Sequence, residues 1–457
     1  MPSNPAPMVQ PVEHEFQSLL AYVTGPNARS QTASPVELTL FRRLLALGAA
    51  LWRLFLVTRA SVRPATPVTA PDGTALPSHD QRPTTDYAVV DNVHFERHFF
   101  TAPGQAGICP LDAELSVPAH GYSDLRREWA AYGATDASYR ESQTVLARIL
   151  GLSLSRQALE TEVIAAGGDV TRFYAQPAEP AAPVPAATIL AVQADGQGVP
   201  MVQPPTEAPS VRLAKGQKRT KKKAAVVTGL YTIAPYPRTP QDLVATLLQD
   251  ADRPEPTARP QPVAKALQAT LEGKAVAMSR LAQRAAQRQG PHIQPRVALT
   301  DGAEALPQQV VTHVPAHTLV LEIIHATEYW WDTANALLGE SHPQRPAWVR
   351  AYLEPLLAGQ TDAVSTALEA EGKDPACTGA PRQAVHRTVG YYRRNRPSMR
   401  DDKYLAQGWP IGTGVIEGAC GPLVKERLEQ SGMRWTPAGA QAVLDLRAVR
   451  LNGHWDR

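Results

Sequence analysis

Cysteine is scarce in this chain, which has only Cys109, Cys377 and Cys420. Thiols so far apart in sequence form neither a disulfide framework nor a metal-binding knuckle. We therefore expect the chain to work in a reducing, cytoplasmic compartment.

Long apolar runs are absent as well. The most apolar early stretch, residues 44–57, is interrupted by Gly48 and Arg53 and is shorter than a membrane span. We expect no membrane association and no targeting segment.

Excess charge of one sign is also lacking, because the net charge is only +3. That sum does not identify a nucleic-acid-binding protein, although the basic residues do come in runs. An apolar fraction of 43% in a chain of 457 residues predicts a globular protein of two to four domains. Proline, by contrast, is plentiful, with 42 residues, and predicts extended linkers.

The first part of the chain reads as mainly helical, with one small β segment. Helices are expected at 13–24 and 36–60 within an N-terminal region 1–75, and residues 61–86 as a loop. Region 87–175 combines a β pattern at 87–100 with helices at 137–150 and 155–166. Arg156, Gln157 and Glu160 would lie on the exposed face of the second helix. The pair is either a DNA-reading helix-turn-helix or a plain helical hairpin.

A Pro- and Ala-rich linker is expected at 176–186, and after it the sequence changes from mainly helical patterns to short β patterns. Short strands are expected at 188–192, 199–202, 224–233, 296–300 and 318–324, with helices at 240–250 and 260–289. Residues 325–395 and 437–450 read as helical. The order β-β-β-α-β-β followed by helices is the topology of the RNase H-like α/β fold, a mixed five-stranded sheet whose first strand is central, beside the fourth.

Three acidic residues occupy notable places in this pattern. Asp195 and Asp301 each precede a glycine at the end of an expected strand, and Glu417 lies near the start of a late helix. An Asp-Gly step after a strand is usually only a turn, but two such steps with a helix-borne glutamate are more specific. The buried stripe of that helix is expected to be Ile416, Cys420, Leu423, Val424 and Leu428.

Clustered carboxylates repel one another unless cations compensate their charge. Ligand sets made of oxygen favour Mg²⁺ or Mn²⁺. Two such ions, about 3.5–4 Å apart, can stabilise the attacking and leaving oxygens of an in-line phosphoryl transfer. We therefore expect two divalent ions held by Asp195, Asp301 and Glu417.

The C-terminal sequence carries the most specific motif. Residues 408–428 (GWPIGTGVIEGACGPLVKERL), 431–435 (SGMRW) and 440–447 (AQAVLDLR) closely resemble the DDE transposases of bacterial insertion sequences, specifically the ISKra family. The likeness extends back through residues 297–302 (VALTDG), 323–325 (IIH) and 195–196 (DG), and covers about residues 85–455.

The resemblance implies a DNA transposase acting on the terminal inverted repeats of its own element, in the cytoplasm at the nucleoid. It implies the catalytic, metal-binding roles of Asp195, Asp301 and Glu417. It also implies double-stranded DNA, both ends and target, as the partner, and a homodimer or higher oligomer. The RNase H-like core would comprise 187–324 and 406–457, interrupted by an all-helical insertion at 325–405 and preceded by helical DNA-binding domains.

Two supporting residues also follow from the resemblance, with some departures from the family pattern. Relatives carry an acid and a histidine separated by two residues near the second aspartate, here Glu322 and His325, where the acid is usually Asp. Thr413 replaces a serine between two glycines and keeps the hydroxyl. Because only Cys109 remains of the family's paired cysteines, we predict no structural zinc.

Basic and aromatic residues suggest DNA contacts in three places. Thr413 opens a helix where it either holds a phosphate or packs tightly, and Trp435 either stacks on a base or belongs to the core. The predicted contacts are Lys218, Arg219, Lys221, Lys222, Lys223, Arg393, Arg394, Arg396, Thr413, Lys425, Arg427, Arg434 and Trp435.

Two alternatives remain open at the level of sequence. A metal-dependent nuclease or resolvase on the same fold would use the same acids only to hydrolyse DNA. A non-catalytic DNA-binding protein descended from a transposase would not need the acids, so their presence disfavours it.

Overall fold

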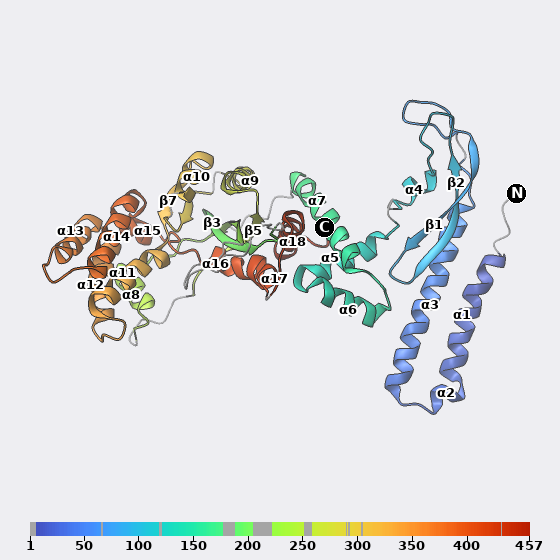
Figure 1. Ribbon diagram of the computed structural model, residues 1–457, viewed down its shortest axis with the longest axis horizontal. Helices are drawn as coiled ribbons and strands as arrows, with labels where there is room; N and C mark the ends of the chain where they lie inside the picture. The colour runs from blue at the N-terminus through green and yellow to red at the C-terminus, as the bar shows by residue number, and fades with distance from the viewer. Residues whose placement is uncertain are drawn as a thin grey trace, which may run out of the picture. The chain divides into compact units, whose positions relative to one another are not determined.

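The computed structural model describes residues 6–64, 67–117, 121–176, 188–203, 222–250, 258–288, 290, 293–302, 305–430 and 432–457. The chain divides into two compact units, Met1–Ala166 and Gly167–Arg457, which are described separately (Figure 1). Most of the predicted 176–186 linker and the predicted DNA contacts Lys218, Arg219 and Lys221 lie outside the described residues. The predicted domain boundaries stay predictions.

The first unit consists of helices and one β hairpin. The expected helices at 13–24 and 36–60 are confirmed, and both start earlier than predicted. The elements are α1 (Ala6–Thr24), α2 (Pro26–Arg29), α3 (Ala33–Ala60), β1 (Ser78–Tyr87), β2 (Asn92–Phe100), α4 (Pro110–Glu114), α5 (Asp124–Asp136), α6 (Tyr139–Leu150) and the start of α7 (Arg156–Ala175).

The loop expected at 61–86 is wrong in its second half, because strand β1 begins at Ser78 and pairs with β2. The sequence of β1, SHDQRPTTDY, is polar and mostly exposed, so it lacks the apolar alternation that marks a strand. Its partner β2 supplies the buried side chains Val93 and Phe95.

The expected helix pair is confirmed as α6 and α7. Gly151 ends α6 in a left-handed conformation, with φ of 73°. The Ser155 hydroxyl caps α7 by accepting the Ala158 amide at 3.0 Å. Arg156 and Gln157 are exposed, and the DNA-reading role of this pair stays a prediction.

The second unit is built on a five-stranded mixed sheet in the order β5-β4-β3-β6-β7. Neighbours β3–β4 and β4–β5 are antiparallel, whereas β3–β6 and β6–β7 are parallel. The central place of the first strand, beside the strand at 296–300, is thus confirmed. The strands are β3 (Ile189–Pro200), β4 (Lys222–Ile233), β5 (Val263–Thr270), β6 (Arg296–Thr300) and β7 (Thr318–Leu321).

Two predictions within the sheet are wrong. The segments 188–192 and 199–202 are one strand, β3, which pairs with β4 from Ile189 to Pro200 without a turn. The predicted helix 260–289 is strand β5 followed by helix α9 (Lys274–Gln287). The β5 sequence, VAKALQAT, is rich in helix-forming residues, so pairing with β4 outweighs local propensity here.

Side-chain alternation along β3 distributes its residues between two cores. Ile189 and Ala191 face a cluster shared with α8 (Pro240–Leu247), α11 (Ile323–Leu338), α12 (Arg345–Leu357), α13 (Thr361–Gly372) and α14 (Ala380–Asn395). Leu190 and Val192 face a cluster shared with α9 and α10 (Ala305–His313). Gln193 and Asp195 therefore belong to the first face.

Between β7 and the late helices the chain is helical, as predicted for 325–395. Helices α11 to α14 are followed by a short 3₁₀ turn, η1 (Arg396–Ser398), and α15 (Asp401–Ala406). Figure 1 shows these helices gathered at one end of the second unit. Within the described residues, no helix has the length and apolarity needed to cross a membrane.

The chain closes with α16 (Gly414–Cys420), a π-helical turn, η2 (Gly421–Lys425), α17 (Glu426–Leu428) and α18 (Pro437–Leu451). The predicted buried stripe is confirmed, since its members are at most 2% exposed: Ile416, Cys420, Leu423, Val424 and Leu428.

Candidate metal centre

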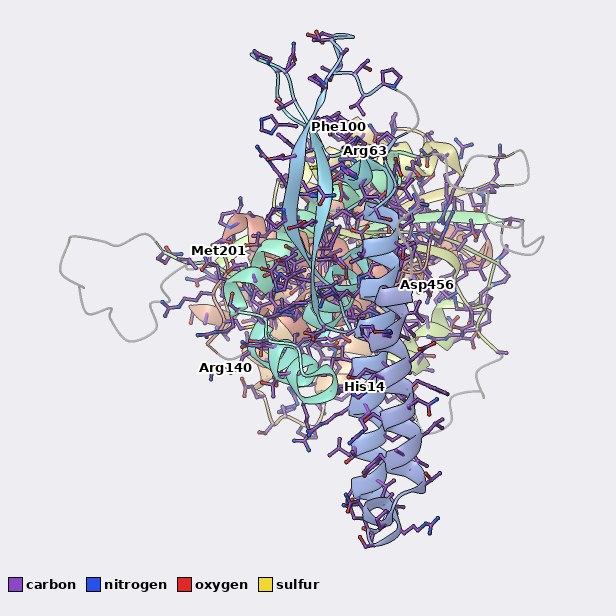
Figure 2. All side chains as sticks on the ribbon, turned by 90° about the vertical axis from the view of Figure 1, so that its right-hand side faces the viewer. His14, Arg63, Phe100, Arg140, Met201 and Asp456 are labelled. Atoms are coloured by element: carbon purple, nitrogen blue, oxygen red, sulfur yellow. The ribbon has the colours of Figure 1, made fainter. Side chains whose placement is uncertain are left out.

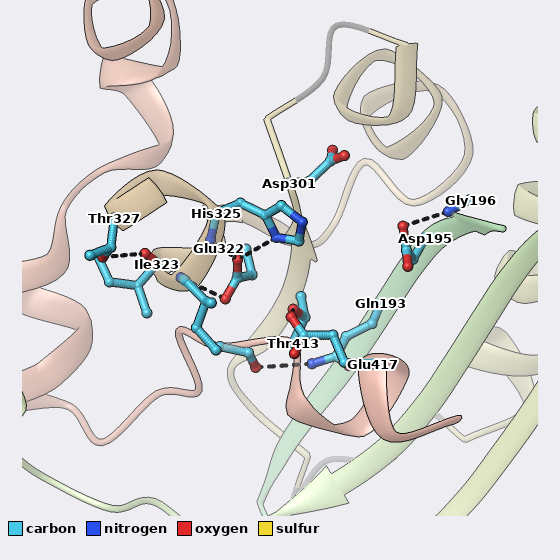
Figure 3. Close-up of polar contacts among 12 residues, drawn as sticks. Gln193, Asp195, Gly196, Asp301, Glu322, Ile323, His325, Thr327, Thr413 and Glu417 are labelled. Carbon is cyan, nitrogen blue, oxygen red and sulfur yellow. Dashed lines mark hydrogen bonds and ion pairs between the residues drawn. The ribbon is translucent and has the colours of Figure 1, made fainter. Parts of the chain in front are cut away.

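Strand register aligns three acidic residues in one row. The β3–β6 ladder pairs Gln193 with Leu299, and the same offset sets Asp195 level with Asp301. The β6–β7 ladder pairs Thr300 with Leu321, and its continuation sets Asp301 level with Glu322. Residues level on parallel strands point to the same face, with strands about 4.8 Å apart. Asp195 lies in β3, whereas Asp301 and Glu322 directly follow β6 and β7, so the row describes their backbone positions; Figure 3 shows how their side chains are directed.

Asp195 lies inside strand β3 and not at its end, which corrects the expected strand-end position. Its carboxylate accepts the Gly196 amide at 2.6 Å and the Gln197 side chain at 3.0 Å. The Cys420 thiol on α16 donates to it at 3.4 Å. Burial raises the pKa of Cys420 to about 12, and the Asp195 charge adds to this shift. Cys420 therefore stays protonated and acts as a donor to Asp195.

Asp301 directly follows β6, as predicted. Its backbone carbonyl accepts a hydrogen bond from the Tyr391 hydroxyl of α14 at 3.0 Å, and Gly302 continues the chain with φ of +76°. In Figure 3 the Asp301 carboxylate points away from Glu417. Tyr391 of α14 thus holds the backbone at Asp301, whose side chain is half-buried.

Gln193 fixes the helix that carries Glu417. This side chain is 1% exposed. Its amide oxygen accepts the Ile416 backbone amide at 3.0 Å, and its amide nitrogen donates to the Tyr231 hydroxyl at 2.9 Å and to the Gly412 carbonyl at 3.3 Å. Because Gln193 is two residues from Asp195, it ties the start of α16 to the strand that presents the first acid. The sequence signal for it, a polar residue within an apolar strand, was missed.

Glu417 is exposed on the first turn of α16. The Thr413 hydroxyl donates to one of its carboxylate oxygens at 2.7 Å. Thr413 itself is 5% exposed, so its hydroxyl serves Glu417 and not a phosphate in this conformation. The predicted DNA contact of Thr413 is therefore not supported.

Glu322 and His325 form a compact pair at the start of α11. Glu322 is fully buried and accepts the Ile324 and His325 backbone amides at 2.8 and 2.6 Å. It also bonds the His325 ring at Nδ1, at 2.8 Å. Partial burial alone would lower the pKa of His325, but the hydrogen bond and charge of Glu322, with Glu328 and Asp301, raise it.

One group of the described residues has the spacing of a metal site. Ligand atoms of Glu322, His325 and Glu417 all lie within 4.8 Å of one another. Neither Asp195 nor Asp301 belongs to this group, so the three predicted acids do not converge on one point. With Nδ1 bonded to Glu322, the other ring nitrogen of His325 is the one that can bind a metal, in the usual carboxylate–histidine arrangement. Carboxylate and imidazole donors suit a divalent cation.

Most of the predicted cationic contacts that the structure describes are exposed, and several have acidic partners. Lys222 lies 2.8 Å from Glu429, and Arg393 lies 2.6 Å from Glu369. Arg396 lies 2.5 Å from Asp362. Exposed pairs of this kind are weak. The exposed set is Lys222, Lys223, Arg393, Arg394, Arg396, Lys425 and Arg434.

Arg427 and Trp435 are buried, at 1% and 6% exposure, so their predicted DNA contact is wrong in this conformation. The Arg427 guanidinium lies 4.7 Å from the centre of the Trp435 ring. The indole donates to the Leu428 carbonyl at 3.1 Å, and the Trp435 amide donates to Pro200 at 3.0 Å. Trp435 therefore anchors the chain after α17 to the end of β3, and Arg427 packs on the Trp435 ring.

A groove of about 600 Å³ runs along a second face of α16. Gly414 and Gly418, one turn apart, line it, and a Cβ on either would meet no atom within 4 Å. Ile324 and Gly412 also line the groove, so it begins beside Glu322. Its other lining residues include the cations Arg238, Arg259 and Lys265 and the aromatic Tyr236.

Comparisons with known proteins add no relative: no family model matches the chain, and neither does any curated protein.

Proposed function

We propose that the chain is a DNA transposase that performs metal-dependent phosphoryl transfer at the ends of its own element. The observation that carries the proposal is the parallel pairing of β3, which contains Asp195, with β6, which Asp301 directly follows, combined with Glu417 on a helix that Gln193 ties to β3.

The sheet supports an RNase H-like core. Three antiparallel strands continued by two parallel ones, with the first strand in the centre, are what that fold requires. In the proposal, the helices from α11 to α15 are an insertion between the fifth strand and the helix that carries the last acid.

The donor set supports Mg²⁺ or Mn²⁺, most simply as two ions. In the proposal Asp195, Asp301 and Glu417 would hold them, with His325 as a further ligand that Glu322 orients; of these ligands, Glu417 and His325 already lie within 4.8 Å of one another, and bound ions would have to draw Asp195 and Asp301 toward them. Bound ions would supply charge compensation for the carboxylates and activation of a water or a DNA 3′-hydroxyl.

The chain's own residues would prepare the site for that chemistry. Gln193 and Thr413 hold Glu417 in place, and the Cys420 thiol and the Gln197 amide orient Asp195. Tyr391 fixes the backbone at Asp301. Such fixed geometry lowers the reorganisation needed at the moment of reaction.

Duplex DNA is the proposed partner. Exposed Lys425 and Arg434 follow the Glu417 helix in the chain and would bind phosphates. The groove on the second face of α16 has the cations and the aromatic ring suited to a strand leaving the site.

The test uses the full chain and DNA duplexes that carry the terminal repeats of its element. Asp301→Ala should abolish Mg²⁺-dependent end cleavage while leaving the affinity for the repeats within about twofold, because the carboxylate serves chemistry and not DNA recognition. Asp332→Ala, at an exposed aspartate of α11, is the matched control and should cleave like the parent. Cleavage retained by Asp301→Ala would refute the assignment of the site.

A further inference from the structure

The two long helices of the first unit carry an uncovered apolar face. Its side chains are between 39% and 51% exposed and are Phe16, Leu20, Val23, Leu38, Phe41, Leu44, Leu51 and Phe55. A surface helix normally turns such residues toward a core, and exposed patches of several hundred Å² mark interaction sites.

Helical spacing sets these residues in stripes. On α1, Phe16, Leu20 and Val23 follow one another at intervals of four and three residues. On α3, Phe41 and Leu44 are three residues apart, and Leu51 and Phe55 are four residues apart. Residues with these intervals share one side of a helix.

The rest of the unit covers only one end of this helix pair. Of the 28 residues of α3, just Leu56 and Ala60 are buried, and they pack on Val93 and Phe95 of β2. In Figure 2, side chains of both helices project outward near α2, where no other element of this unit lies against them. Among the described residues of its own unit, the apolar face therefore lacks a partner along most of its length.

We propose that this face binds the same face of a second copy of the chain, forming a four-helix bundle. Eight large apolar side chains that are 39–51% exposed present an apolar area on the order of several hundred Å². A stable interface buries about 800 Å² per partner. Two-fold symmetry makes a face complementary to itself, and packing two helical hairpins gives a common bundle architecture.

Charge favours one of the two-fold arrangements. Helix α1 carries Glu13 and Glu15 and no Lys or Arg, whereas α3 carries four arginines and one glutamate. An axis parallel to the helices lays α1 of one copy over α3 of the other, so that opposite charges meet at the rim of the interface. This proposal goes beyond the phosphoryl-transfer function and does not depend on it.

Sedimentation velocity of the full chain tests the proposal. The parent should sediment as a dimer, or a multiple of one, at micromolar concentration. Leu44→Glu should raise the dimer dissociation constant at least 100-fold, because it buries two unpaired charges at a symmetric interface. Val311→Glu, at a 62% exposed valine of α10, is the matched control and should sediment like the parent.

Two further measurements make each outcome decisive. Circular dichroism should give the same helix content for all three proteins, and Leu51→Gln replaces Leu44→Glu if the latter unfolds. A monomeric parent at about 100 μM, or Leu44→Glu and Leu51→Gln that both dimerise like the parent, would overturn the proposal. A monomer that floats with anionic phospholipid vesicles would assign the face to membranes and overturn it too.

Discussion

At the scale of single residues, Gln193 connects the sheet to the helix that carries Glu417. A buried amide with three hydrogen bonds stabilises the chain, whereas leaving its partners unsatisfied costs about 1–3 kcal/mol. The same bonds set the distance between the first acid and the last.

Gln193→Met should therefore lower the free energy of unfolding by about 1–3 kcal/mol and weaken Mn²⁺ binding, because α16 loses its anchor on β3. Urea denaturation and Mn²⁺ titration by electron paramagnetic resonance measure the two effects. Gln308→Met, at an exposed glutamine of α10, should change neither. Unchanged Mn²⁺ affinity in Gln193→Met would show that Gln193 is structural only.

Asp401 is a second residue whose environment has a measurable consequence. Burial raises the pKa of its carboxyl to about 7, and Asp402 adds to the shift. The side chain is 1% exposed, and its Oδ1 has no hydrogen-bond partner among the described residues. Between pH of about 4, where an unfolded aspartate ionises, and about 7, only the folded chain keeps this proton.

Stability should consequently fall as the pH rises from about 4 to 7 and level off above, because the folded state binds more protons than the unfolded state in this window. In the parent, Asp401 should lower the free energy of unfolding by an amount on the order of 4 kcal/mol across this pH range. Asp401→Asn should lack this decrease. The free energy of unfolding at pH 4.5 and pH 8 measures this, with exposed Asp456→Asn as control. A parallel pH dependence of Asp401→Asn and the parent would contradict the account.

At the scale of elements, helix α14 positions the loop that follows β6. A Cβ at Gly302 would lie 2.6 Å from Leu321 Cδ1 and 2.9 Å from the Tyr391 hydroxyl oxygen. The residue also has φ of +76°, which disfavours any side chain. Packing between β6, β7 and α14 therefore depends on glycine next to Asp301.

Gly302→Ala should lose about 1–2 kcal/mol from its left-handed backbone and a further ~1–3 kcal/mol from overpacking, with a larger fall in activity than in folded fraction. Gly453→Ala, with φ of +69° and no atom within 4 Å, should lose only the backbone part. Thermal melts and cleavage assays on both variants measure this. Equal losses in the two would show that the Tyr391–Leu321 packing is unimportant.

The elements also show how far the sequence could predict the fold. Predictions for strongly patterned segments are confirmed: the stripe from Ile416 to Leu428 is buried, and the first strand lies in the centre of the sheet. Strand β5 was read as helix because Ala, Lys, Leu and Gln favour helices locally, and only its pairing with β4 makes it a strand.

The candidate site was predictable in part for a similar reason. Residue type and order singled out Asp195, Asp301 and Glu417. The row of Asp195, Asp301 and Glu322 depends on strand register, which a single sequence does not specify. The compact group of Glu322, His325 and Glu417 depends on contacts more than 90 residues apart in the chain, so it emerged only from the structure.

At the scale of the whole molecule, the two units carry different proposals. The unit Gly167–Arg457 contains the acids and the groove. The unit Met1–Ala166 contains the exposed face of α1 and α3, helix α6 and the start of α7. Joining two DNA ends to a target requires two active sites, so a dimer through α1 and α3 would be compatible with the proposed chemistry.

Strand transfer tests the central claim most directly. The full chain is incubated with a pre-cleaved terminal-repeat duplex, a supercoiled target plasmid and Mg²⁺, and joined products are counted by sequencing across the junctions. We predict joining by the parent and at least a 100-fold decrease in Asp195→Asn, Asp301→Asn and Glu417→Gln, with DNA affinity kept. Cleavage without any joining would indicate a nuclease, and joining that survives all three substitutions would contradict the proposed site.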